Sequence, residues 1–178
     1  MSLRTLVLVP ALALAAIVVP VTVAQNAYAD PTWYVQSQKV VKLARSQLGY
    51  HEHGANCQKY GPCEEWCSLF ATWVWDKTVN NVPRYAFTGD VYKWGGRHKL
   101  NYGKSNLKKH IRPGDALLFG TGPSSTSTST HIGLVEKVSG SKVTLIEGNS
   151  GNRVARHTYT ISSHRFYGGV HPTSAYPR

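Results

Sequence analysis

The stretch Glu64–Asp76 reads Glu-Glu-Trp-Cys-Ser-Leu-Phe-Ala-Thr-Trp-Val-Trp-Asp, and it decides the fold of the chain. At the helical period its apolar side chains cover almost the whole circumference. A helix that is apolar nearly all round is a buried one, so we expect this segment to be the central helix of a domain. Pro62, just before it, is typical of a helix start. The polar residues left on one narrow stripe are Glu64, Ser68, Thr72 and Asp76.

Cys67 lies in the first turn of this predicted helix. Backbone N–H groups in a first turn have no helical partner, and the positive end of the helix dipole favours a thiolate. A thiolate in such a place is a nucleophile. A free cysteine is also among the most frequently buried residue types, so a plain core cysteine explains the position equally well. The helix alone leaves both interpretations open.

The first 29 residues are typical of a secretory signal. Arg4 precedes an apolar run from Leu6 to Ala24, and Ala27-Tyr28-Ala29 supplies the small residues of a cleavage site before Asp30. The run is about long enough to span a bilayer, so an uncleaved membrane anchor is the alternative. Two prolines and the cleavage site favour removal. The expected division of the chain is a signal peptide at 1–29, one catalytic domain at 30–172 and a frayed tail at 173–178.

The chain is strongly basic. It carries 20 Lys and Arg against 9 Asp and Glu, a formal net charge of +11. Removing Arg4 with the signal leaves 19 against 9, or +10. Such a charge suits an anionic polymer, and for an exported protein a negatively charged cell wall is the most economical partner. The charge also fits plain solubility. No nucleic-acid-binding motif is present, and we expect a monomer with no stable membrane association after cleavage.

Three cysteines are present, and an odd number in an oxidising compartment leaves one thiol free. Cys57 and Cys63 flank a turn-like segment and can close a small loop. Cys63 and Cys67 could pair instead if the helix starts late. We favour Cys57–Cys63, which leaves Cys67 free. A zinc site at His51, His53, Cys57 and Cys63 is the other alternative, but its spacings do not match the usual ligand pairs. We expect no metal and no other cofactor.

The two halves of the chain differ in period, which indicates an α+β fold. An amphipathic helix is predicted at 34–48, and a short helix that starts at Thr88 or Asp90 should stop at Gly95-Gly96. The Gly, Pro, Ser and Thr segment at 121–130 predicts a mobile loop. The second half alternates in hydrophobicity as an antiparallel meander should. The expected strands are 115–119, 131–138, 142–147, 154–160 and 166–170.

A histidine and a carboxylate should meet across one hairpin of this meander. Leu145, Glu147 and Asn149 share the buried face of the return strand, where a carboxylate and an amide need partners. His131 starts the strand opposite. A histidine held by a carboxylate has a fixed tautomer and can serve a cysteine nucleophile as a base. A structural His–Glu pair is the alternative. No other histidine is predicted to have an Asp or Glu at an equivalent cross-strand position.

Four ordered motifs carry a family resemblance: Trp66–Trp75, Arg112–Phe119, His131–Val135 and Ile146–Asn149. Together they resemble the CHAP domain, the cysteine, histidine-dependent amidohydrolase/peptidase family, over about residues 35–170. The resemblance implies a papain-like (NlpC/P60-like) α+β fold and cleavage of amide bonds in peptidoglycan. It places the nucleophile on Cys67, the base on His131 and orienting roles on Glu147 and Asn149. The paired acidic residues that bind calcium in some members are not evident around Glu52 to Cys63.

The expected function is that of a secreted cysteine hydrolase of cell-wall peptide, either an N-acetylmuramoyl-L-alanine amidase or a peptide endopeptidase. Its partners would be peptidoglycan and anionic wall polymers, and its reaction would pass through a thioester. Backbone N–H groups at the helix start, with Tyr60 as a further candidate, would stabilise the oxyanion. The alternative is a non-catalytic basic wall-binding or interaction domain, which would not need all four site residues.

Overall fold

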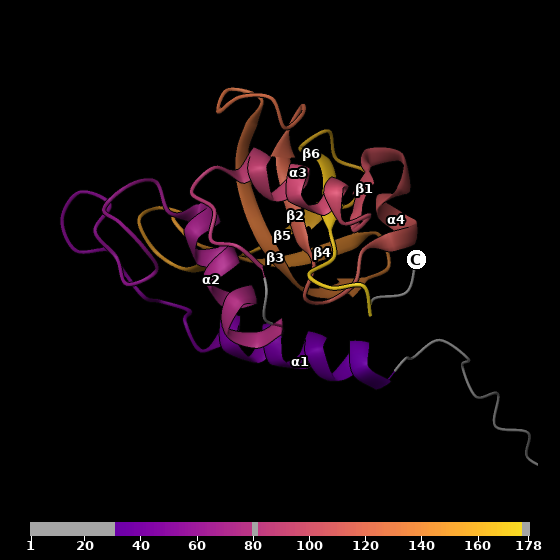
Figure 1. The fold of residues 1–178 in the computed structure, drawn as a ribbon, viewed down its shortest axis with the longest axis horizontal. Coiled ribbons are helices and arrows are strands. Elements are labelled where there is room, and N and C mark those ends of the chain that lie inside the picture. Colours follow the sequence, from indigo (N-terminus) through magenta and orange to yellow (C-terminus); the bar gives the residue numbers. More distant parts are fainter. Residues whose placement is uncertain (1–30, 80–81, 176–178) are drawn as a thin grey trace, which may run out of the picture.

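The computed structural model describes residues 31–79 and 82–175. The predicted signal peptide at 1–29 and the tail residues 176–178 lie outside them. One six-stranded antiparallel sheet has the strand order β1-β6-β2-β3-β4-β5, with α1, α2 and α3 packed beside it (Figure 1). The elements are α1 (Pro31–Arg45), α2 (Cys67–Val79), α3 (Thr88–Arg97), β1 (Asn101–Gly103), the 3-10 turn η1 (Lys104–Asn106), α4 (Leu107–His110), β2 (Ala116–Gly120), β3 (Ser129–Ser139), β4 (Lys142–Glu147), β5 (Ala155–Thr160) and β6 (Phe166–Val170).

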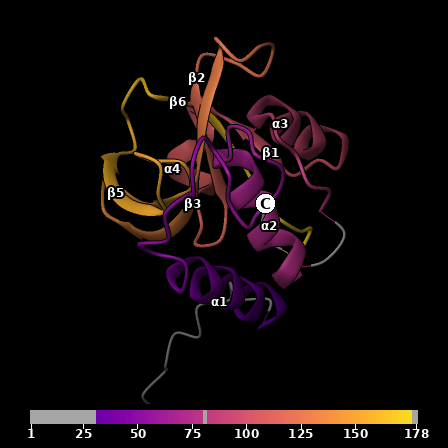
Figure 2. The ribbon, with the colours of Figure 1, turned by 90° about the vertical axis from the view of Figure 1, so that its left-hand side faces the viewer.

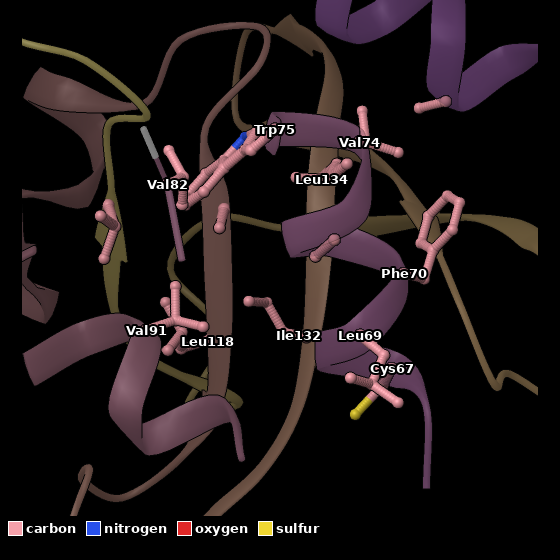
Figure 3. Packing of buried hydrophobic residues seen from close by; sticks show 14 of the residues in the cluster. Cys67, Leu69, Phe70, Val74, Trp75, Val82, Val91, Leu118, Ile132 and Leu134 are labelled. Atoms are coloured by element: carbon pink, nitrogen blue, oxygen red, sulfur yellow. The ribbon is translucent and has the colours of Figure 1, made fainter. Parts of the chain in front are cut away.

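Both faces of the central strands β2 and β6 are buried, because successive strand residues point to opposite sides and both sets are buried, whereas β5 at the edge is largely exposed. One face packs against the three helices, with side chains such as Leu118, Ile132 and Leu134 (Figure 3). The other face is enclosed by the curl of the sheet and by α4, and we call it the inner face. Its buried side chains are Tyr102, Leu107, Ile111, Leu117, Phe119, Val135, Val143, Leu145, Ile161 and Phe166. The predicted α+β fold, with the Cys67 helix buried against an antiparallel sheet, is confirmed.

The central helix is buried as expected, but it starts later than predicted. It begins at Cys67, and the segment from Pro62 to Trp66 is not helical. A disulfide at Cys63 and a turn from Glu64 N to the Pro62 carbonyl hold that segment in another conformation. Two residues of the predicted polar stripe are buried, Ser68 and Thr72, and the Thr72 hydroxyl donates to the Ser68 carbonyl at 2.8 Å, whereas Glu64 is exposed.

The first and third helices also differ from their predicted limits. The first spans Pro31–Arg45 rather than 34–48, and Gly49 follows in a left-handed conformation that ends the next turn. The third continues through Gly95-Gly96 to Arg97. Its glycines serve close packing instead of termination, because a Cβ at Gly95 would lie 2.7 Å from a methyl of Val170. None of the helices among residues 31–79 and 82–175 has the length and apolar character needed to cross a membrane.

The strand order departs from a simple meander at its last step. Strands β2 to β5 follow one another as predicted, but β6 returns to the other side of β2 and pairs with it and with β1. The short strand β1 was not predicted, because three residues give no recognisable alternation. The return of β6 brings the residue after it, His171, next to the start of β2. This placement matters for the second histidine pair described below.

Candidate active site

Cys67 occupies the first position of α2. The first helical hydrogen bond runs from Phe70 N to the Trp66 carbonyl at 2.9 Å, so the N–H groups of Cys67 and the two residues after it precede the helical ladder. The Cys67 side chain is 9% exposed, and Figure 3 shows its sulfur at the open end of the helix. The helix start thus places a free thiol beside backbone donors that the helix does not pair.

The cysteine pairing is the one predicted. Cys57 and Cys63 form a disulfide, and Cys67 is free. Oxidation of the first two removes the thiolates that a zinc site at His51 and His53 would have used. Among the residues that the structure describes, no group of three or more His, Cys, Asp or Glu side chains is arranged to hold a metal ion.

The segment before the nucleophile is held by a buried aromatic contact. Glu52 accepts a hydrogen bond from the Trp66 indole at 2.7 Å, and the Tyr60 ring stacks on Trp66 at 5.6 Å between centroids. Tyr60 is almost fully buried, and its hydroxyl donates to Gln47 at 3.2 Å. That hydroxyl therefore has a structural contact after α1. A role of Tyr60 as an oxyanion donor stays a prediction, beside the backbone N–H groups at the start of α2.

His131 and Glu147 meet across the β3–β4 hairpin as predicted. Nε2 of His131 lies 3.0 Å from Oε2 of Glu147, with the side chains 22% and 2% exposed. Two glycines permit this approach. A Cβ at Gly133 would lie 2.8 Å from Cγ of Glu147, and a Cβ at Gly148 would lie 2.4 Å from Cβ of Phe70 on α2. The first leaves room for the carboxylate on β4, and the second lets the end of β4 press against the nucleophile's helix.

His131 stands between Glu147 and Cys67. Burial lowers the pKa of His131, but hydrogen bonds and charge interactions with Cys67 and Glu147 outweigh it and raise that pKa to about 9. Because Nε2 faces Glu147, Nδ1 is the ring nitrogen left to face Cys67. The imidazole is therefore protonated at neutral pH and lies between two acidic groups. A histidine placed between a thiol and a carboxylate in this way can act as the base for a cysteine nucleophile.

Comparison with known sequences identifies the family. The family model named "CHAP domain" matches residues 58–149, just over half of the chain, and the match includes Cys67, His131 and Glu147. The chain belongs to the CHAP-domain family. No curated protein matches it recognisably in sequence.

Two solved structures share the fold of this CHAP domain. The peptidoglycan hydrolase RipB from Mycobacterium tuberculosis superimposes with a TM-score of 0.53 and 16% identity, over 82% of this chain and 69% of that one. Ly7917, solved with the hydrolysing product of MDP, superimposes with a TM-score of 0.51 and 18% identity, over 76% of this chain. The chain spans 62% of the length of Ly7917. At such identities the likeness shows a common fold.

Asn149 does not bond to the imidazole of the CHAP site in this structure. It follows β4 in a left-handed conformation (φ 54°), and its Nδ2 donates to Oε2 of Glu65 at 2.6 Å. The sequence placed Asn149 on the same strand face as Glu147, but the strand ends at Glu147 and the turn redirects the amide. Glu65 was not predicted as its partner, because nothing in the sequence relates the two positions.

A second histidine–carboxylate pair lies elsewhere in the sheet, contrary to the prediction that no other histidine has an Asp or Glu at an equivalent cross-strand position. Nδ1 of His171 lies 2.8 Å from Oδ1 of Asp115, with the side chains 6% and 0% exposed. Oδ2 of Asp115 accepts from the Tyr102 hydroxyl at 2.6 Å and from Arg112 N at 2.8 Å. The prediction failed because a simple meander keeps β6 away from β2, and the real strand order brings them together.

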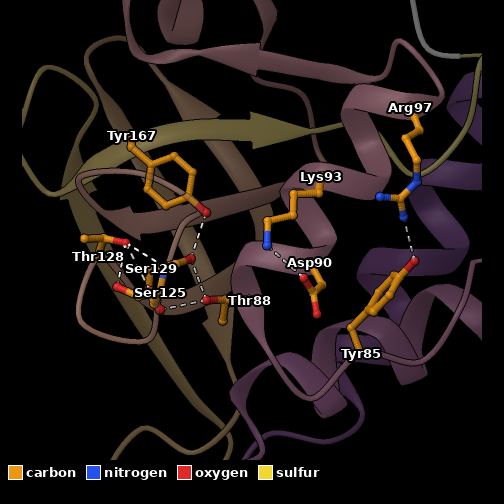
Figure 4. Close-up of polar contacts among 9 residues, drawn as sticks. All are labelled: Tyr85, Thr88, Asp90, Lys93, Arg97, Ser125, Thr128, Ser129 and Tyr167. Atoms are coloured by element: carbon orange, nitrogen blue, oxygen red, sulfur yellow. Dashed lines mark hydrogen bonds and ion pairs between the residues drawn. The ribbon is translucent and has the colours of Figure 1, made fainter.

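The start of β3 is fixed by hydroxyl groups that the sequence did not identify. Ser129 and Thr130 belong to β3 instead of the predicted loop. The Ser129 hydroxyl lies 2.6 Å from that of Thr88 and 2.8 Å from that of Tyr167 (Figure 4). Within the loop, the N–H groups of Thr121 and Gly122 bond to the carbonyl of Thr128. These bonds anchor β3 two residues before His131, where the Ser and Thr composition suggested only a mobile segment.

Proposed function

We propose that the protein is a secreted cysteine hydrolase that cleaves amide bonds in the peptide part of peptidoglycan. The observation that carries this proposal is the convergence of Cys67, His131 and Glu147, with the imidazole held between the thiol and the carboxylate. Membership of the CHAP family and the shared fold with a peptidoglycan hydrolase support the choice of substrate. The disulfide and the basic charge support export to a negatively charged wall.

The proposed reaction has two halves. The Cys67 thiolate attacks the amide carbonyl carbon, and backbone N–H groups at the start of α2 stabilise the oxyanion. The carbon–nitrogen bond then breaks, and the leaving amine takes the proton of the His131 imidazolium. A thioester on Cys67 remains. His131 next takes a proton from water, which attacks the thioester, releases the carboxylic acid and restores the thiolate.

Glu147 supports His131 in both halves. Its carboxylate accepts from Nε2–H, which fixes the tautomer and stabilises the imidazolium. Asn149 is proposed as an indirect contributor, since its bond to Glu65 joins the turn after β4 to the segment before α2. In the mature domain the roles of nucleophile, base and orienting carboxylate thus belong to Cys67, His131 and Glu147.

Purified peptidoglycan of defined composition tests the proposal. The wild-type domain should release soluble fragments, and Cys67→Ala should bind the same walls and release none. Mass spectrometry of the fragments separates the two specificities: an amidase frees the lactyl carboxylate of muramic acid, and an endopeptidase creates a new amine within the peptides. Equal binding with no release by either protein would favour the non-catalytic wall-binding alternative.

A further inference from the structure

Glu147 has one oxygen that its bond to His131 does not explain. Oε2 faces Nε2 of the imidazole, whereas Oε1 is buried and makes no hydrogen bond of normal length with any residue in 31–79 or 82–175. A carboxylate oxygen is costly to bury without a donor, because it loses its hydration. A donor placed beside Oε1 would offset that cost and would also act on the carboxylate that holds the base.

Tyr159 on β5 lies on the same inner face of the sheet. It pairs with Val143 in register, and the sheet curves round at the β5 edge (Figure 2). Its ring packs against Phe119 and Phe166, with centroids 5.3 and 5.7 Å away, and Phe119 in turn contacts the His131 ring at 5.2 Å. The tyrosine therefore belongs to the aromatic cluster that surrounds the His131–Glu147 pair.

The Glu147 carboxylate is among the groups that raise the pKa of Tyr159, although no hydrogen bond of normal length joins the two side chains. Burial raises the pKa of Tyr159 most, and the charge of Glu147 and a hydrogen-bond interaction with it raise that pKa further. Arg165, with its guanidinium carbon 5.9 Å from the ring centre, acts in the opposite direction. The other ionisable groups around the pair are His131 and, through it, Cys67. The phenol thus stays protonated and available as a donor.

We propose that Tyr159 is a positioning residue whose hydroxyl donates to Oε1 of Glu147 and fixes the carboxylate plane against His131. The inference rests on the proposed function of the Cys67 site and adds a group to it. A carboxylate held by one oxygen can pivot about its last carbon–carbon bond, and a second donor prevents this. Hydrogen bonds at catalytic groups are often long without substrate, and we propose that this one already holds the Glu147 carboxylate in the substrate-free protein. Tyr159 gives up no proton, and its effect reaches the substrate only through Glu147 and His131.

Tyr159→Phe tests the proposal, because it keeps the ring in the aromatic cluster and removes only the hydroxyl. The matched control is Thr158→Val on the same strand, whose hydroxyl lies on the opposite face, 3.0 Å from that of Thr144. For Tyr159→Phe we expect kcat on a soluble muropeptide to fall about tenfold with KM unchanged. The pKa of His131, followed by NMR of its ring, should fall from about 9 to about 8 because the carboxylate supports the imidazolium less well. Thr158→Val should leave both quantities at wild-type values.

Two results would overturn the proposal. One is a Tyr159→Phe protein with the wild-type His131 titration. The other is a fall in kcat of Tyr159→Phe that is matched by an equal fall in Thr158→Val, or that is explained by a loss of folded Tyr159→Phe protein in circular dichroism. The titration needs no substrate, so it tests the Tyr159–Glu147–His131 coupling even if the wild-type domain hydrolyses no peptidoglycan, in which case the proposed function alone would fail.

Discussion

The sheet carries two histidine–carboxylate pairs whose distances are nearly equal and whose surroundings differ. His131 and Glu147 lie 3.0 Å apart at the start of α2, and His171 and Asp115 lie 2.8 Å apart beside β1. The first imidazole is partly exposed and faces Cys67 as well as its carboxylate. In the second pair Asp115 is completely buried, and both of its oxygens accept hydrogen bonds. Pair distance alone therefore does not distinguish a candidate catalytic site from a structural one.

The carboxylates show the distinction most clearly. Asp115 joins Tyr102 from β1, the backbone before β2 and His171 after β6, so it ties three neighbouring strands together. Glu147 serves one imidazole and leaves Oε1 without a close donor. A fully bonded buried carboxylate is part of the fold, and its removal leaves several donors unsatisfied. Glu147 instead has one partner, and that partner, His131, is partly exposed and lies next to Cys67, so this pair can take part in a reaction.

The largest effect is expected from the nucleophile and its base. Cys67→Ser and His131→Ala should each reduce peptidoglycan hydrolysis by about a thousandfold or more, because an alcohol ionises far less readily than a thiol and the nucleophile needs its base. The double variant should be no worse than either single one, since the two act as a unit. Turbidity loss of purified walls measures the rate, and circular dichroism checks the fold. Additive losses in the double variant would contradict a shared site.

Glu147→Gln should have the next largest effect. The amide keeps the shape and one acceptor but removes the charge that supports the imidazolium. We expect the rate to fall about a hundredfold. This loss is smaller than the roughly 10⁴-fold loss that follows when replacing the orienting carboxylate also leaves the histidine in the wrong tautomer. The melting temperature should change little. A parallel loss of rate and melting temperature would place Glu147 with Asp115 as a structural carboxylate.

The pH dependence should separate the two pairs further. Folding raises the pKa of His131 to about 9 from an ordinary value of 6.5. The stability that this provides is fully present below pH 6.5 and is lost as the pH rises through about 9. Activity should decline over the same upper range, because the leaving amine then lacks its acid. In Glu147→Gln this alkaline limb should move to lower pH. Profiles of kcat/KM between pH 6 and 10 measure it, and an identical limb in both proteins would contradict the role of Glu147.

Asp115→Asn should affect stability with little effect on rate. Breaking a buried pair of this kind costs about 3 kcal/mol in unfolding free energy, and we expect the folded fraction to hydrolyse walls within about twofold of wild type. Asp90→Asn is the control, because Asp90 and Lys93 form an exposed ion pair at 3.2 Å that is worth less than about 1 kcal/mol. Urea unfolding gives both values. A stable Asp115→Asn protein with a much reduced rate would reverse the assignment of the two pairs.

The sequence predicted the elements that hydrophobic periodicity specifies. The apolar run around Cys67 identified the buried helix, and the alternation before Glu147 placed that carboxylate opposite His131, because strand parity is local information. The odd number of cysteines and their loop spacing led to the Cys57–Cys63 pairing. Each of these inferences depends on neighbours in the chain, and the structure confirms the placements.

Long-range pairing could not be predicted in the same way. His171 and Asp115 are 56 positions apart, and they meet only because β6 crosses to the far side of β2, a choice that alternation does not determine. The late start of α2 depends on the disulfide at Cys63 and on the turn between Glu64 and Pro62. The position of Glu65, the partner of Asn149, depends on that start. The hydroxyl contacts of Ser129 were missed because a run of Ser and Thr has the composition of an open loop. These are tertiary contacts that override local preference.

The most direct test of the central claim is alkylation of Cys67 under non-reducing conditions. The account predicts that iodoacetamide adds one label per molecule, that peptide mapping places it on Cys67, and that hydrolysis of walls is lost in proportion to labelling. Soluble muropeptide should slow both the labelling of Cys67 and the loss of wall hydrolysis. A labelled Cys67 in a protein that still clears walls at the wild-type rate would contradict the assignment of Cys67 as the nucleophile.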